Sequence, residues 1–112
     1  MLSFQRLDVY RCAIELLALT APMSGAVPRG FSSLAEQLRR AALSVPLNIA
    51  EAAGRTTAVD AARHYAIARG SAMECAAIVD SLHVLSMVDD TQRTKILELI
   101  GRIVSMLTRL CR

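Results

Sequence analysis

Two short polar segments hold the residues best suited to chemistry. One is Pro46-Leu-Asn-Ile-Ala-Glu51 and the other is Arg69-Gly-Ser-Ala-Met-Glu74. Each ends in a glutamate, and two carboxylates that face each other can act as a general acid and a general base. Spacings of three and four residues put the polar side chains of each segment on one face of a helix. The sequence therefore has one place where acid–base catalysis is conceivable.

A structural role explains the same residues better. A carboxylate between helices needs partners, and arginine, asparagine and serine side chains supply charge-assisted hydrogen bonds. We therefore interpret these residues as a structural polar seam that joins two helices. The predicted seam consists of Ser44, Asn48, Glu51, Arg69, Ser71 and Glu74.

Other patterns for catalysis or metal binding are absent. The Glu-x-x-His motif of di-metal helix bundles does not occur, and Asp80-x-x-His83 is a single copy with a different carboxylate. Phosphate-binding loops, zinc-protease motifs and nucleophile elbows are also missing. Cys75 precedes Ala-Ala-Ile, which favours packing in a core over a reactive thiol. We expect no catalytic residue, no metal site and no cofactor.

Length and cysteine content limit the architecture further. With 112 residues the chain fits one domain, residues 1–112. Cys12, Cys75 and Cys111 are odd in number and widely spaced, which favours free thiols and a cytoplasmic location over a disulfide framework. The run without charge from Leu16 to Pro28 is interrupted by proline and glycine and is shorter than a membrane span, so no membrane partner is expected.

Helical periodicity predicts the elements that position these residues. We expect helices from about Asp8 to Ala21, from Ser33 to a stop at Gly54, from Thr57 to about Met87, and from Asp89 or Asp90 to the C-terminus. Short connections imply antiparallel neighbours. The predicted fold is all-α, an antiparallel up-and-down four-helix bundle.

Single residues refine this prediction. Pro22 should end the first helix, and Pro46 should kink the second. Ser33 with Glu36, and Thr57 with Asp60, have the spacing of capping boxes. Gly70, in the middle of the third helix, should mark a close approach of another helix.

Apolar stripes predict which faces are buried. In the first helix the stripe is Leu7, Tyr10, Ile14, Leu17 and Ala18, and in the second it is Phe31, Leu34, Leu38, Ala42, Val45, Ile49 and Ala52. The fourth helix has one stripe of Ile96, Ile100, Ile103, Leu107 and Leu110, and a second at heptad spacing, Leu97, Val104 and Cys111. Because two stripes need two partners, we predict that the second contacts a neighbouring subunit of a homo-oligomer.

Arginine dominates the positive charge. The net charge is +3, and only Lys95 among 13 cationic residues is a lysine. The candidates for contacts with nucleic-acid phosphates are Arg39, Arg40, Arg55 and Arg63. Repeated around an oligomer, they would form a basic rim. The alternative is that they are solvated surface residues or partners in salt bridges.

Three segments carry a resemblance to a known family. They are Tyr10-Arg-Cys-Ala-Ile-Glu-Leu16, Gln37-Leu-Arg-Arg-Ala-Ala-Leu-Ser-Val-Pro-Leu-Asn-Ile-Ala-Glu51 and Ile67-Ala-Arg-Gly-Ser-Ala-Met-Glu74. Together they resemble the 23S rRNA intervening-sequence protein family. The resemblance implies a four-helix bundle that forms a ring-shaped homopentamer. It also implies kinship with accessory proteins of diversity-generating retroelements, which bind nucleic acid and associate with a reverse transcriptase.

Two functions follow as hypotheses. The first is a non-catalytic oligomer that binds RNA or DNA without sequence preference through its arginines. The second is a scaffold that docks a partner protein, such as a reverse transcriptase, and has no meaningful affinity for nucleic acid. The sequence contains no groove-reading motif and no aromatic platform that would favour base-specific recognition.

Overall fold

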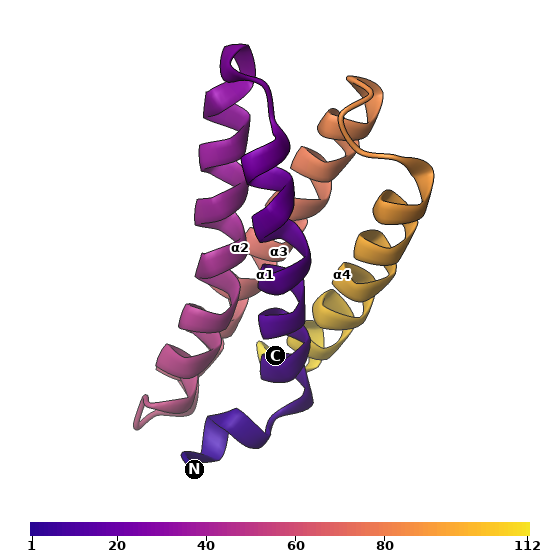
Figure 1. The fold of residues 1–112 in the computed structure, drawn as a ribbon. Coiled ribbons are helices and arrows are strands. Elements are labelled where there is room, and N and C mark those ends of the chain that lie inside the picture. Colours follow the sequence, from indigo (N-terminus) through magenta and orange to yellow (C-terminus); the bar gives the residue numbers. More distant parts are fainter.

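The chain folds into four helices with no strand. The computed structural model describes residues 1–112. Its elements are η1 (Ser3–Arg6), α1 (Asp8–Ala26), η2 (Arg29–Phe31), α2 (Ser32–Ala53), α3 (Ala58–Val84) and α4 (Asp90–Leu110). Successive helices alternate in direction, so both ends of the chain lie at the same end of the bundle (Figure 1). The prediction of an all-helical protein with four helices is confirmed.

The core is mainly aliphatic and draws on all four helices. From α2 it takes Leu38, Val45 and Ile49, and from α4 Ile96 and Ile103, all 2% exposed or less. These positions belong to the predicted stripes. Ala41 of α2 and Ala68 and Ala72 of α3 are also buried, and such small side chains let helix axes approach closely. α2 and α3 accordingly form the most extensive helix–helix contact in the molecule.

The face that α1 buries differs from the prediction. Its buried residues are Val9, Cys12, Ala13, Leu16, Thr20, Met23 and Ser24. The predicted stripe lies beside them, with Tyr10 and Leu17 half-buried and Ile14 and Ala18 exposed. Apolar residues occupy both faces of this helix, so periodicity alone could not identify the buried one. The exposed apolar residues of α1 remain available for another surface.

Pro22 does not end α1, which continues to Ala26. Proline removes the hydrogen bond to the carbonyl four residues earlier, here Ala18. Because Ala18 and Pro22 are both exposed, water can bind that carbonyl and the cost stays small. The buried Ser24 hydroxyl then donates to the Ala35 carbonyl at 3.3 Å, which joins the last turns of α1 to α2.

The helix ends agree only in part with the predicted caps. Thr57 Oγ1 accepts from the Asp60 amide at the start of α3, and Asp89 and Gln92 form a capping box at the start of α4. By contrast, no side chain caps α2 at its N-cap, Phe31. α3 ends at Val84 rather than Met87, because Ser86 has φ of 63°, which a right-handed helix cannot contain.

α2 continues through the buried Pro46 and ends at Ala53. Gly54 is its C-cap, as predicted from the sequence.

None of the four helices combines the length and apolar character that crossing a bilayer requires.

The outward position of Gly70 corrects another expectation. Gly70 is exposed, and a Cβ atom built on it meets no atom within 4 Å. No helix of the same chain therefore approaches it. Gly101 of α4 is equally exposed and open.

We predict that Gly70→Ala stabilises the protein. Alanine in an open helical position is worth about 0.5–1 kcal/mol over glycine, so the melting temperature followed by circular dichroism should rise by a few degrees. Gly101→Ala is the matched control and should give a similar increase. A loss of stability, or of self-association, in Gly70→Ala alone would mean that another chain packs against this glycine.

Candidate functional site

A hydrogen-bonded network of polar side chains joins α2 to α3. The hydroxyl oxygens of Ser44 and Ser71 lie 2.8 Å apart across the two helices. Asn48 Nδ2 donates to the Ser44 carbonyl at 2.9 Å and to Ser44 Oγ at 3.0 Å. His64 Nδ1 lies 3.4 Å from Asn48 Oδ1 and must be the donor there, since that oxygen has no hydrogen. The network holds the two serines in register.

One hydroxyl hydrogen in this network has no protein acceptor. The two serines carry two hydroxyl hydrogens, and only one of these can lie between their oxygens. Whichever serine donates in this pair, the other keeps one hydroxyl hydrogen without a protein acceptor. That hydrogen is free for a solvent molecule or a ligand.

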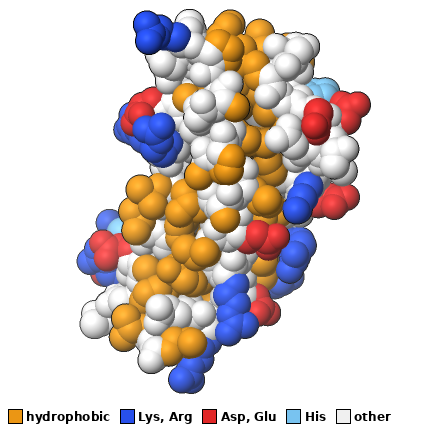
Figure 2. Space-filling view, viewed as in Figure 1, with side chains coloured by type: hydrophobic (Ala, Val, Ile, Leu, Met, Phe, Trp, Pro, Cys, Tyr) orange, Lys and Arg blue, Asp and Glu red, His pale blue; other side chains and the backbone are white.

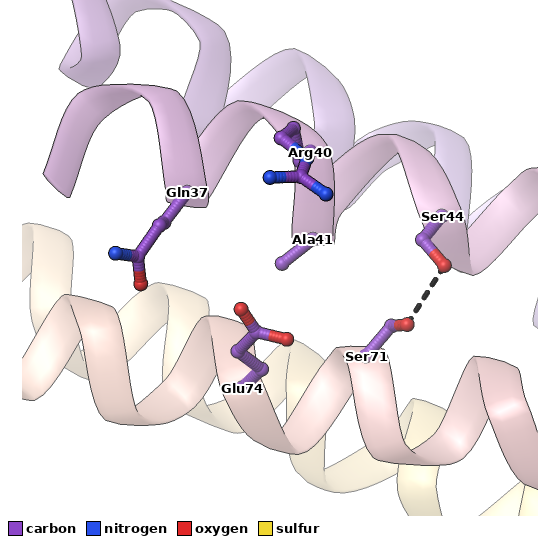
Figure 3. Close-up of a pocket in the computed structure, with 6 residues that line it drawn as sticks. All are labelled: Gln37, Arg40, Ala41, Ser44, Ser71 and Glu74. Carbon is purple, nitrogen blue, oxygen red and sulfur yellow. Dashed lines mark hydrogen bonds between the residues drawn. The ribbon is translucent and has the colours of Figure 1, made fainter. Parts of the chain in front are cut away.

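This free donor lies in a polar groove. The groove has a volume of about 370 Å³ and is lined by Gln37, Arg40, Ala41, Ser44, Ser71 and Glu74. Gln37 and Arg40 on α2 lie opposite Glu74 on α3, and the hydrogen bond between the serines lies at one end (Figure 3). Arg40 and Glu74 are both exposed, and neither forms an ion pair.

The other residues of the predicted seam lie outside the groove. Glu51 is exposed and pairs with Arg55 at 3.1 Å, so it is not a buried carboxylate. Arg69 turns toward α4, where its Nε donates to Thr108 Oγ1 at 2.8 Å. Only Ser44, Asn48 and Ser71 form the predicted link between helices. The sequence placed all six on two helical stripes but could not show which way each long side chain turns.

The four predicted phosphate-binding arginines form two groups at different levels of the bundle. Arg39 and Arg40 lie in the first turns of α2, whereas Arg55 and Arg63 flank the turn that follows it. From Arg40 to the end of α2 the helix rises roughly 20 Å. Arg39, Arg55 and Arg63 also form exposed ion pairs with Glu36, Glu51 and Asp60. Of the four, Arg40 is the one without such a pair.

A different group of arginines gathers at the end of the bundle where the chain begins and ends. The start of α1 and the end of α4 lie together there, since Leu7, Asp8 and Val9 line one hollow with Met106, Arg109 and Leu110. We call this region the basic end, after its exposed arginines without ion pairs: Arg6, Arg11, Arg102, Arg109 and Arg112. Figure 2 shows Lys and Arg side chains along the α4 side and at the lower end of the molecule. Sequence reasoning missed them, although an antiparallel bundle with an even number of helices must bring its termini together.

Comparison with known families identifies one match. Residues 5–109 match the family described as 23S rRNA-intervening sequence protein. The chain belongs to this family. No curated protein gives a significant match to the sequence.

Exposed apolar residues of this family member lie mainly outside α4. The predicted contact residues Leu97, Val104 and Cys111 are only half-exposed, and Val104 packs against the core. Ile14 and Leu43 are each 42% exposed, and Leu47 is 58% exposed. The Ser24–Ala35 contact sets α1 against α2 so that Ile14 lies level with the stretch between Leu43 and Leu47. We call these three residues the apolar patch, and Figure 2 shows hydrophobic side chains gathered over this part of α1 and α2.

The thiols of this family member differ in environment. Cys12 and Cys75 are buried, whereas Cys111 is partly exposed. Burial, and secondarily the charge of Glu74, raise the pKa of Cys75 from 9.0 to about 12. A thiol with so high a pKa is a poor nucleophile, because the thiolate is the reactive form. No three His, Cys, Asp or Glu side chains are grouped so that they could hold a metal ion.

We predict that one thiol, Cys111, reacts with a chromogenic disulfide reagent in the native protein at pH 8, and that three react in denaturant. Since folding raises the pKa of Cys75, the unfolded chain loses this proton first as the pH rises. The contribution of Cys75 to stability is therefore complete below about pH 9 and declines as the pH approaches 12. Rapid native labelling of Cys75, located by mass spectrometry, would contradict this assignment.

Proposed function

We propose that this protein is a non-catalytic homo-oligomer that binds nucleic acid without sequence preference through its basic end. The observation that supports the proposal is that Arg6, Arg11, Arg109 and Arg112 lie near the two chain ends, with Arg102 two turns further along α4, all exposed and without ion pairs. Guanidinium groups bind phosphate through two parallel hydrogen bonds. These five arginines outnumber Asp8 and Glu15, the two acidic residues of α1, so positive charge predominates where the chain begins and ends.

Arg55 and Arg63 extend the same surface. The α2–α3 turn lies at the end of the bundle that also holds the termini (Figure 1). Their partners Glu51 and Asp60 hold them in exposed ion pairs, which contribute about 0–1 kcal/mol and can be exchanged for phosphate at little cost. In an oligomer, each subunit would add another copy of this charge to a shared rim.

The side chains near the basic end favour contact with phosphates over contact with bases. Phe4 and Tyr10 pack edge-to-face against each other, with ring centroids 5.0 Å apart. Neither is exposed enough to serve as a stacking platform. Without base stacking or a groove-reading helix, the expected affinity depends on charge and is independent of sequence.

We predict that replacing Arg109 and Arg112 together by Gln weakens binding of a single-stranded oligonucleotide by at least tenfold at low salt. Each lost phosphate contact should also reduce the slope of log affinity against log salt by about 0.7, the value for single strands. Fluorescence anisotropy over a salt series measures both quantities.

The matched control is Arg39→Gln with Arg40→Gln, which removes the same charge from the distant half of α2. It should keep nearly the wild-type affinity and slope. Equal losses in the two double variants would indicate an effect of net charge alone. No binding of RNA or DNA by wild type at low salt would exclude the proposed function.

The alternative is a scaffold that docks a partner protein, such as a reverse transcriptase, without binding nucleic acid. The apolar patch supports docking of another chain, because exposed leucine and isoleucine side chains gain free energy when a partner covers them. The same patch also supports self-association. It is a better candidate for a subunit contact than the half-buried Leu97, Val104 and Cys111.

We predict that Leu47→Glu lowers the oligomer mass measured by light scattering and leaves the helical circular dichroism unchanged. A charge at the centre of an apolar contact must be desolvated when subunits associate. Val84→Glu is the control, since Val84 is 81% exposed at the end of α3 and away from the patch. A monomeric wild type, or equal dissociation by both variants, would refute an oligomer built through this patch.

A further inference from the structure

The α2–α3 groove presents opposite charges on its two walls. Arg40 on α2 and Glu74 on α3 both line it, and no ion pair or hydrogen bond occupies either side chain. Neighbouring charges behave differently: Arg39 pairs with Glu36, and Asp80 pairs with Arg93. The groove therefore keeps one free cation and one free anion facing each other.

Neutral donors and acceptors complete the lining. The Ser44–Ser71 pair lines one end of the groove, and the hydroxyl hydrogen left over there is a second donor (Figure 3). The amide of Gln37 supplies both a donor and an acceptor opposite Glu74 (Figure 3). Asn48 bonds to Ser44 from outside the groove, and His64 bonds to Asn48, so the serine oxygens are held in place.

These groups select the charge type of a ligand. A simple anion would be attracted by Arg40 but repelled by Glu74. A simple cation would be attracted by Glu74 but repelled by Arg40. A zwitterion satisfies both walls: its carboxylate can accept from the Arg40 guanidinium and a serine hydroxyl, while its ammonium group donates to Glu74. We propose that this groove binds a small zwitterion, namely a free α-amino acid with a polar side chain.

The size and polarity of the groove fit that ligand class. A volume of about 370 Å³ lies within the usual range of small-molecule sites and exceeds what a single ion needs. Ala41 is the one apolar residue of the lining, which disfavours a hydrophobic side chain. Because the groove is open and its charged groups are exposed, the affinity should be weak, in the millimolar range. The groove is separate from the basic end. The proposal of ligand binding and the proposal of nucleic-acid binding can therefore be tested, and refuted, independently.

Ligand-observed saturation-transfer NMR on the full-length protein tests the proposal with L-glutamine as the probe. Two analogues each lack one charge: N-acetyl-L-glutamine has no ammonium group, and L-glutaminamide has no α-carboxylate. We expect saturable binding of L-glutamine and at least tenfold weaker binding of both analogues. No saturable signal with L-glutamine, or equal binding of all three compounds, would overturn the proposal.

Protein variants locate the site. Arg40→Gln and Glu74→Gln should each weaken L-glutamine binding at least tenfold and keep the wild-type circular dichroism spectrum, since both side chains are exposed. Arg39→Gln is the matched control, being adjacent in sequence but outside the groove, and should bind as wild type does. Wild-type binding by Arg40→Gln or by Glu74→Gln would refute the assignment. The assignment would also be refuted if both variants melted at a lower temperature and still bound L-glutamine as wild type does. That result would mean that Arg40 and Glu74 form an ion pair with each other.

Discussion

The close packing of α2 against α3 is the contact on which the arrangement of the site depends. Small buried residues, Ala41 on one helix and Ala68 and Ala72 on the other, allow the two axes to approach. The hydroxyl groups of Ser44 and Ser71 then meet at 2.8 Å and fix the axial register of the pair. A one-residue slip of either helix would turn different side chains toward the groove. The free charges of the groove therefore face each other because of a contact between two of the smallest polar side chains in the chain.

The two outer helices complete the bundle with less specific chemistry. α4 packs through β-branched and leucine side chains, and its outward face is polar. The apolar side chains of α1 do not define a single buried face, since they point both inward and outward. The inward set includes Ala13 and Thr20. The Thr20 hydroxyl donates to the Leu16 carbonyl at 2.8 Å, so this buried polar group needs no partner from another helix. A helix of this kind can be buried on one face and can still offer another face to a second chain.

Patterning predicted the four helices and the buried stripes of α2 and α4, because a buried stripe such as that of Ile96, Ile103 and Leu107 must repeat with the helical period. It failed where a residue that usually ends a helix can be accommodated within one at a low cost in free energy. Pro22 lies in an exposed turn, where the missing hydrogen bond costs little, and α1 passes through it. Site residues were predicted least well: Glu51 and Arg69 have long side chains whose direction depends on partners in space, respectively Arg55 and Thr108. The basic end was missed because its arginines are distant in sequence and meet only through the topology.

The same topology separates charge along the bundle axis. Five unpaired arginines lie where the chain begins and ends, whereas the opposite end has Asp89 and Asp90 at the α3–α4 turn and a single unpaired arginine, Arg29, at the α1–α2 connection. The molecule consequently has a permanent electric dipole along its long axis, in addition to its net charge of +3. Near a polyanionic surface it experiences a torque as well as an attraction, and it approaches with one end leading. Its retention on a cation exchanger should therefore exceed that of a protein with the same net charge spread evenly over its surface.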